Sequence, residues 1–201
     1  MLVPEAKYFG HEQLTSRNTL DPTSHPVTVV NKEVMVNGMK IEETYIRKFQ
    51  NLHRDSIPGR WTEATLNKAP HKPLLLLCVS DLYRENSLRE NYIEPTLYIE
   101  EAFNAYWQAL FESDNPSTFA LPFFHLQHDG FWSLVGTNTT SCISDPIITK
   151  SPAALRKTVA CAKLDSALHD LLRQPAWNCH LRSVIIASNF DPEVHRRVVE
   201  L

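Results

Sequence analysis

The stretch that decides the fold is NKAPHKPLLLLCVS, residues 67–80, in which two prolines and a His-Lys pair come directly before an uninterrupted apolar run. Proline suits the first turn of a helix, because its missing N–H would have had no partner there. The pattern therefore predicts a helix that begins at Pro73 and runs to about Glu85. Since residues 74–79 are apolar nearly all round, this helix should lie in the middle of the core.

The start of this predicted helix is a candidate anion site. His71 and Lys72 should stand just outside the helix, and Lys68 lies in the loop that leads into it. Free backbone N–H groups and the positive end of the helix dipole would share a small space with an imidazole and an ammonium, which suits a phosphate. Alternatively, residues 69–73 only cap a buried helix.

The composition is that of one globular domain. The chain has 201 residues, of which 43% are hydrophobic, and this is enough for one well-buried core. A net charge of -3 argues against a protein that coats nucleic acid by bulk charge, although it allows a local basic patch. Any phosphate binding should therefore be confined to a specific site.

The cysteines and the N-terminus indicate an intracellular protein. The four cysteines are far apart and form no C-x-x-C pair, so we expect reduced thiols rather than a zinc ribbon or a disulfide framework. The first residues, MLVPEAKYFGHEQ, lack the pattern of a signal peptide, and no apolar run has the length of a membrane span. We expect a soluble, cytoplasmic protein with no membrane partner.

The periodicity as a whole predicts an α+β fold: a mainly helical single domain with a short antiparallel β-hairpin or sheet and an N-terminal β-rich extension. Residues 27–30 and 33–36 are rich in β-branched residues and precede a tight-turn signal at Asn37-Gly38. We expect an arm with a small hairpin over residues 1–40 and the main domain over residues 41–201. Apolar residues at helical spacing predict further helices at 42–55, 98–112, 152–162, 165–173, 177–187 and from 192 onward.

The predicted β-hairpin of the main domain comprises residues 119–126 and 131–135, because Asp129-Gly130 between two aromatic-rich runs is a favoured turn. A proline within a strand confines it to an edge or an end, which would leave Leu121 and Pro122 partly uncovered as an apolar notch beside His125. Alternatively, the phenylalanines that follow are core residues and Pro122 only marks the strand edge.

A second candidate phosphate contact is TKSPAALRK, residues 149–157. Ser-Pro predicts a helix start, with Lys150 before it and Arg156 inside it. Alternatively, these residues form a solvated basic face.

The chain lacks the usual signatures of catalysis. Neither phosphate-cradling glycine motif occurs, the serines lack a G-x-S-x-G elbow, and the carboxylates Glu94, Asp129 and Asp145 have no companion of the kind that metal-dependent nucleases use. His125 and His128 are three apart, a spacing that on a strand points side chains to opposite faces and prevents joint chelation. We therefore expect a binding protein with no metal and no cofactor.

With these motifs together, the chain resembles the sulfur-binding domain of phosphorothioate-dependent type IV restriction proteins, the McrA-like proteins in which this domain normally precedes an HNH nuclease domain. The resemblance rests on APHKPLLLL at residues 69–77, on PFFHLQHDGFWSL at residues 122–134 and on a helical tail around residues 183–190. It covers roughly residues 40–195. It implies a partner, double-stranded DNA in which sulfur replaces a non-bridging phosphate oxygen.

The resemblance also implies roles for individual residues. The sulfur cavity would be lined by Leu121, Pro122 and His125, where Leu121 replaces the family's usual aromatic residue and His125 replaces a small one. His71 and Lys72 match the basic pair before the core helix, and a further contact to the DNA backbone matches Lys150 or Arg156; Lys68 is a further candidate for the backbone.

The sequence is compatible with three functions. The first is a DNA-binding module that recognises the phosphorothioate link and targets modification-dependent restriction in cellular defence. The second is a subunit or fragment of an HNH-type restriction endonuclease whose nuclease domain lies elsewhere. The third is a protein-interaction domain that uses Trp61, Trp107 or Trp132 at an interface.

Overall fold

The structure is a computed structural model that describes residues 27–30, 33–36, 39–88, 90–111, 118–137, 143 and 146–199, and the side chains from residue 40 onward within these ranges except those of 146, 147 and 199. The predicted N-terminal arm, residues 1–26, and the Asn37-Gly38 turn lie outside the described residues.

A small antiparallel meander forms the N-terminal extension. Strands β1 (Val27–Val30), β2 (Glu33–Val36) and β3 (Met39–Lys40) pair in sequence order, with Val27 opposite Val36. β3 continues directly into helix α1 (Ile41–Gln50). The predicted β-rich extension is confirmed, whereas its separation from the main domain at residue 40 stays a prediction.

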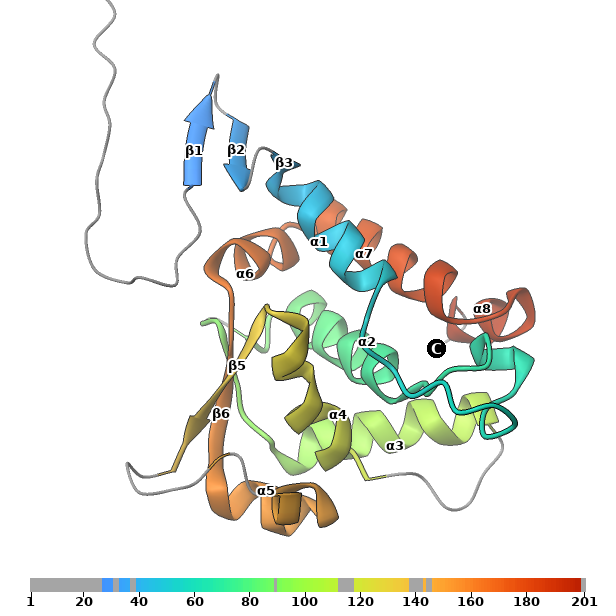
Figure 1. The fold of residues 1–201 in the computed structure, drawn as a ribbon. Coiled ribbons are helices and arrows are strands. Elements are labelled where there is room, and N and C mark those ends of the chain that lie inside the picture. The colour runs from blue at the N-terminus through green and yellow to red at the C-terminus, as the bar shows by residue number, and fades with distance from the viewer. Residues whose placement is uncertain are drawn as a thin grey trace, which may run out of the picture.

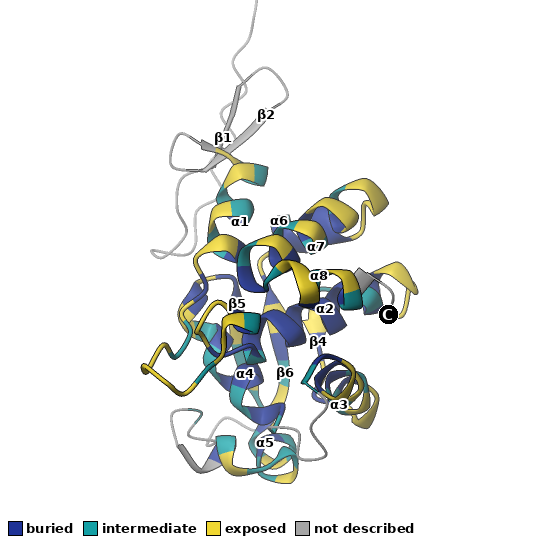
Figure 2. Ribbon diagram, turned by 90° about the vertical axis from the view of Figure 1, so that its right-hand side faces the viewer, coloured by how far each residue is buried: buried dark blue, intermediate teal, exposed yellow. Residues whose placement is uncertain are grey.

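Helix α2 (His71–Arg84) is the centre of the domain, as its apolar run predicts. Figure 1 places it between α7 (Pro175–Asn189) and α3 (Leu97–Phe111), and it contacts both. In Figure 2 it is buried on nearly every face. The helix begins two residues earlier than expected, because Pro70 is its N-cap and Pro73 still falls within the first turn. His71 and Lys72 are therefore part of the helix rather than outside it.

The predicted β-hairpin is wrong in its first arm. Residues 120–125 form helix α4 (Ala120–His125), which continues as a 3-10 turn, η2 (Leu126–Asp129), before strand β5 (Trp132–Gly136) begins. The buried residues of this segment include Phe119, Phe123 and Leu126, which repeat at helical rather than alternating spacing. Pro122 is also buried, so the prediction that it is partly uncovered is wrong, whereas Leu121 is half-buried. Pro122 lies in the first turn of α4, where proline is tolerated, so it does not mark a strand edge.

The partner of β5 comes from a segment that was expected to be helical. Helix α5 (Pro152–Thr158) stops early, and β6 (Val159–Leu164) follows it as the central strand of a sheet with the order β4-β6-β5, where β4 is Tyr92–Ile93. Both pairings are antiparallel, with Trp132 opposite Leu164 and Tyr92 opposite Lys163. The predicted helix over 152–162 is thus wrong from residue 159 on.

The remaining elements complete a mainly helical α+β domain, which confirms the predicted fold class. They are α6 (Ser166–Leu172), α8 (Pro192–Val199) and the 3-10 turns η1 (Glu63–Thr65) and η3 (Pro146–Lys150). Helix α1 ends at Gln50 rather than near residue 55, and the residues that follow form a loop to α2. Within the described ranges, no helix has both the length and the apolar character needed to cross a membrane.

Candidate nucleic-acid interface

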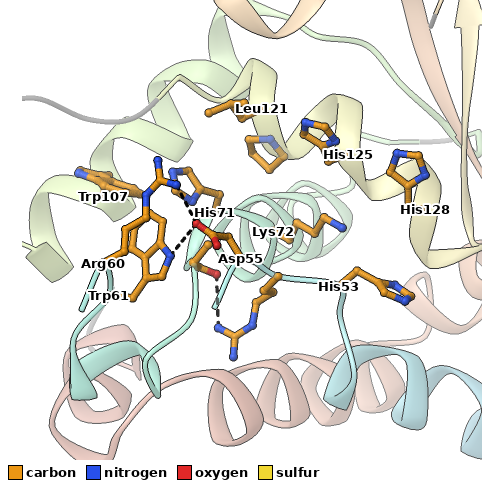
Figure 3. Close-up of a pocket in the computed structure, with 13 residues that line it drawn as sticks. His53, Asp55, Arg60, Trp61, His71, Lys72, Trp107, Leu121, His125 and His128 are labelled. Atoms are coloured by element: carbon orange, nitrogen blue, oxygen red, sulfur yellow. Dashed lines mark hydrogen bonds and ion pairs between the residues drawn. The ribbon is translucent and has the colours of Figure 1, made fainter. Parts of the chain in front are cut away.

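One pocket of about 750 Å³ lies where four segments meet: the loop after α1, the first turn of α2, the α4–η2 segment, and helix α3, which contributes Trp107. Figure 3 shows Leu121, His125 and His128 along one wall, His71 and Lys72 in the middle, and His53, Asp55, Arg60 and Trp61 on the loop that faces them. The pocket is lined by His53, Arg54, Asp55, Arg60, Trp61, Ala69, His71, Lys72, Trp107, Leu121, Pro122, His125 and His128.

The helical conformation of α4 builds one wall of this pocket. Leu121, His125 and His128 are spaced by four and three residues, so they share one face of the continuous α4–η2 segment. The rings of His125 and His128 lie 5.9 Å apart between centroids. The prediction that these two histidines point to opposite faces is therefore wrong. Even so, no group of three potential metal ligands occurs among the described residues.

Five of the predicted site residues come together in the pocket: His71, Lys72, Leu121, Pro122 and His125. The other three candidates are not among its lining residues. Lys68 and Lys150 are exposed to solvent.

Arg156, on α5, is occupied within the fold. It donates to the carbonyl of Pro95 at 2.6 Å and to that of Thr96 at 3.1 Å, and it forms an ion pair with Glu100. Its predicted contact to DNA stays a prediction.

Lys72 lines the pocket, and its ammonium is paired with the carboxylate of Asp129. Its Nζ lies 2.6 Å from Oδ2 of Asp129, and both side chains are buried. Burial lowers the pKa of Lys72, an effect that the bond and the charge of Asp129 oppose. The other oxygen of Asp129 accepts from the backbone N–H of His53 at 2.8 Å and lies 3.0 Å from the ring Nδ1 of His53. Asp129 thus ties the loop, α2 and η2 together.

His71 is an uncharged ring at neutral pH. It is half-buried between Trp61 and Trp107, with ring centroids 5.3 and 5.0 Å away. Burial, helped by the nearby Arg60, lowers its pKa to about 4. At pH 7 His71 therefore adds no positive charge to the site, and its predicted contact to the DNA backbone stays a prediction. Burial also lowers the pKa of His125, with the charges of Lys72 and His128 acting in the same direction.

The loop after α1 has its own ion pair. The carboxylate of Asp55 accepts from the backbone N–H of Ile57, from Nε1 of Trp61 and from Nη1 of Arg60, each at 3.1 Å. These contacts, that of Ile57 first, hold the pKa of Asp55 below its usual value. The guanidinium of Arg60 also lies 5.7 Å from the ring centre of Trp61. Asp55 therefore fixes both side chains at the mouth of the pocket.

Arg54 differs from the other cations of the pocket. Its Nη1 lies 3.4 Å from the carbonyls of Ala69 and Asn189. Within the described part of the chain, no carboxylate lies within ion-pair distance of it. Burial lowers its pKa to about 10.

Sequence reasoning missed most of the loop that forms this site. Residues 53–55, His-Arg-Asp, fall in a segment that was expected to be the end of a helix, and Arg60 was not among the predicted site residues. The sequence feature that could have indicated this loop is a charged tripeptide followed by Pro58-Gly59 and an Arg-Trp pair. Such a polar segment directly before the core helix is typical of a loop that supplies binding residues.

A pocket with one apolar wall and basic side chains on the loop and helix that face it has the chemistry that an anionic partner requires. Comparison with known families identifies that partner as DNA. The model of the family described as ScoMcrA-like, DNA sulfur-binding domain, matches residues 46–200, and the chain belongs to this family of DNA-binding domains. The matched region includes every residue that lines the pocket. A comparison with curated proteins found no match.

Proposed function

We propose that this domain recognises a phosphorothioate link in double-stranded DNA and thereby directs modification-dependent restriction to DNA that carries it. The observation behind the proposal is the pairing of Leu121 and Pro122 with basic side chains in one pocket. An apolar wall suits sulfur, and positive charge suits the anionic link to which the sulfur belongs.

The discrimination would come from solvation. Sulfur is larger, more polarisable and less strongly hydrated than oxygen, so it loses little when it leaves water for an apolar wall. An oxygen in the same place would be left without its hydrogen bonds. An unsatisfied polar group costs about 1–3 kcal/mol, which corresponds to a preference for sulfur of roughly 5- to 150-fold.

General affinity would come from the DNA backbone outside the pocket. Lys68 and Lys150 are exposed, and among the described residues neither has an ion pair like those of Lys72 and Arg156. Contacts of this kind add affinity for any duplex and carry no information about sulfur. We propose Lys68 and Lys150 as backbone contacts, with His125 shaping the far end of the apolar wall.

Restriction requires a nuclease, and we propose that an HNH-type nuclease supplies it, either as a further domain or as a separate subunit. This matches the second sequence-based hypothesis, in which the chain is part of a larger endonuclease. Incubation of the purified chain with modified DNA and Mg²⁺ or Mn²⁺ tests whether this chain only binds DNA and leaves cleavage to the nuclease. We expect binding without nicking, and cleavage by this chain alone would contradict it.

The test of the function is a gel shift with one duplex in three forms: unmodified, with a single phosphorothioate of Rp configuration, and with one of Sp configuration. We expect the domain to bind one of the two modified forms about 5- to 150-fold more tightly than the unmodified duplex. The two configurations should differ, because only one points the sulfur at the wall. Equal binding of all three forms, or no binding, would contradict the proposal.

A further inference from the structure

Two of the three formally positive side chains that line the pocket are already neutralised by a carboxylate. Arg60 pairs with Asp55 at 3.1 Å, and Lys72 pairs with Asp129 at 2.6 Å. In each pair the positive and negative charges cancel before any ligand arrives. Neither pair therefore offers an uncompensated charge to an incoming anion.

His71 and His125 do not replace that charge at neutral pH. His71 has a pKa of about 4 because it is buried, so it is neutral at pH 7. Burial and the adjacent Lys72 shift the pKa of His125 in the same direction. His53 shares the carboxylate of Asp129 with Lys72.

Arg54 is left with an uncompensated charge among the described lining residues. A guanidinium has five N–H donors. Its two carbonyl contacts, at 3.4 Å, are long compared with the usual 2.9 Å and involve only Nη1. Withdrawing an unpaired cation from water is unfavourable, and an anion that enters the pocket would reverse that penalty. The pocket is thus one negative charge short of neutrality.

We propose that Arg54 is the residue that binds the anionic oxygen of the DNA link, so that one guanidinium balances one phosphodiester or phosphorothioate diester. A diester of either kind carries a single negative charge, which matches the single uncompensated cation. Because Arg54 comes from the loop and Leu121 and Pro122 come from α4, the two contacts are made by different elements. The inference rests on the proposed function and names the side chain that holds the target's charge.

The proposal separates affinity from discrimination. Arg54 interacts with an oxygen that modified and unmodified links both have, whereas the apolar wall interacts with the sulfur. Arginine suits this role because its guanidinium stays charged and presents several N–H donors in one fixed plane to that oxygen. Loss of Arg54 should therefore weaken binding to both kinds of duplex by the same factor and leave their ratio unchanged.

The test is a titration of labelled duplexes with the wild-type domain and with Arg54→Met, which keeps much of the apolar stem, at several salt concentrations. We expect Arg54→Met to bind the phosphorothioate duplex and the unmodified duplex about 10- to 100-fold more weakly. The slope of log affinity against log salt should fall by about one phosphate contact, roughly 0.9. Arg54→Lys should restore part of the loss.

Two controls make the result decisive. Arg84→Ala removes an exposed arginine that pairs with Asp81 and does not line the pocket, and it should bind like wild type. The melting temperature of Arg54→Met without DNA should equal or exceed that of wild type, because the change removes an unpaired cation.

Two results would overturn the assignment: wild-type affinity in Arg54→Met, or a weakening that falls on only one of the two duplexes. A separate failure would concern the proposed function alone. The wild-type domain could show no preference for sulfur while Arg54→Met still bound both duplexes more weakly. That result would support the role of Arg54 in anion binding and contradict the proposed recognition of sulfur.

Discussion

At the scale of single residues, Lys72, which was predicted to bind the DNA backbone, also has a structural role. Its ammonium and the Asp129 carboxylate lie 2.6 Å apart, with both side chains almost fully buried. A buried ion pair adds little stability over an apolar pair of the same shape, but breaking it leaves an uncompensated charge. Asp129 also accepts from the backbone of His53, so the loop that carries Arg54 depends on it.

Lys72→Met should therefore reduce stability more than it reduces affinity. We expect the free energy of unfolding, measured by chemical denaturation, to fall by about 3–5 kcal/mol, because Asp129 loses its counter-ion. The double variant Lys72→Met with Asp129→Asn should recover part of that loss. Lys68→Met, at an exposed neighbour, should change stability by less than about 0.5 kcal/mol. A stable Lys72→Met protein with weakened DNA binding would show that Lys72 is a direct contact instead.

His71 predicts a pH dependence of stability. Its pKa is about 4 in the folded protein and about 6.5 when unfolded, so between these values the unfolded state binds more protons. Its contribution to stability is therefore full above about pH 6.5 and is lost as the pH falls toward 4. Between pH 7 and pH 5 the loss should be about 2 kcal/mol.

His71→Phe keeps an aromatic ring between Trp61 and Trp107 and removes the titration. The measurement is urea denaturation of wild type and variant at pH 7 and pH 5. We expect the wild type to lose about 2 kcal/mol more than the variant over this interval. The same pH dependence in both proteins would contradict the uncharged, desolvated state assigned to His71.

At the scale of elements, the central helix was predictable and the pocket wall was not. Eleven residues of α2 are buried, and the run of leucines after Pro73 leaves few alternatives to a core helix. In residues 119–126, by contrast, aromatic content and Asp129-Gly130 favoured a strand and a turn. Here the burial of Phe119, Phe123 and Trp132 decides the outcome: their rings pack edge to face, and Trp132 donates to the carbonyl of Phe123 at 2.9 Å.

Strand β6 could not be predicted from the sequence, for a related reason. Its sequence, VACAKL, has small residues that suit a helix, and its partners β4 and β5 come from distant parts of the chain. Pairing on both sides overrides the weak local preference. The same limit applies to the site: Leu121, Pro122, His71 and Lys72 were identifiable as motifs, whereas the neutralising role of Asp129 depends on contacts that no local pattern reveals.

The wall formed by α4 gives a prediction at this scale. Leu121→Ser replaces a half-buried side chain in the first turn of α4 and leaves the buried phenylalanines in place. We expect the preference for the phosphorothioate duplex to fall about 5-fold, since roughly 1 kcal/mol of apolar contact is lost. Binding of the unmodified duplex should stay within about 2-fold of wild type, a change of roughly 0.4 kcal/mol.

Leu97→Ser is the matched control for this change. Leu97 is 65% exposed at the start of α3 and does not line the pocket. Its substitution should leave the ratio of the two affinities unchanged. An unaltered ratio in Leu121→Ser, measured in the same titration, would show that α4 does not contact the sulfur.

At the scale of the whole molecule, a protein with a net charge of -3 cannot rely on its overall field to attract DNA. The described pocket fits this constraint, because its cations are mostly paired and a single guanidinium remains uncompensated. Binding should therefore rest on a few well-placed contacts, with weak affinity for DNA that lacks the modification. Such an arrangement suits a sensor that must ignore most of the DNA it meets.

The most direct measurement is a crystal structure of the domain bound to a duplex with one phosphorothioate of the preferred configuration. We expect the sulfur to lie in van der Waals contact with Leu121 and Pro122, while the remaining non-bridging oxygen of the same link accepts from the guanidinium of Arg54. A sulfur that points to solvent, or a link bound away from this pocket, would contradict it.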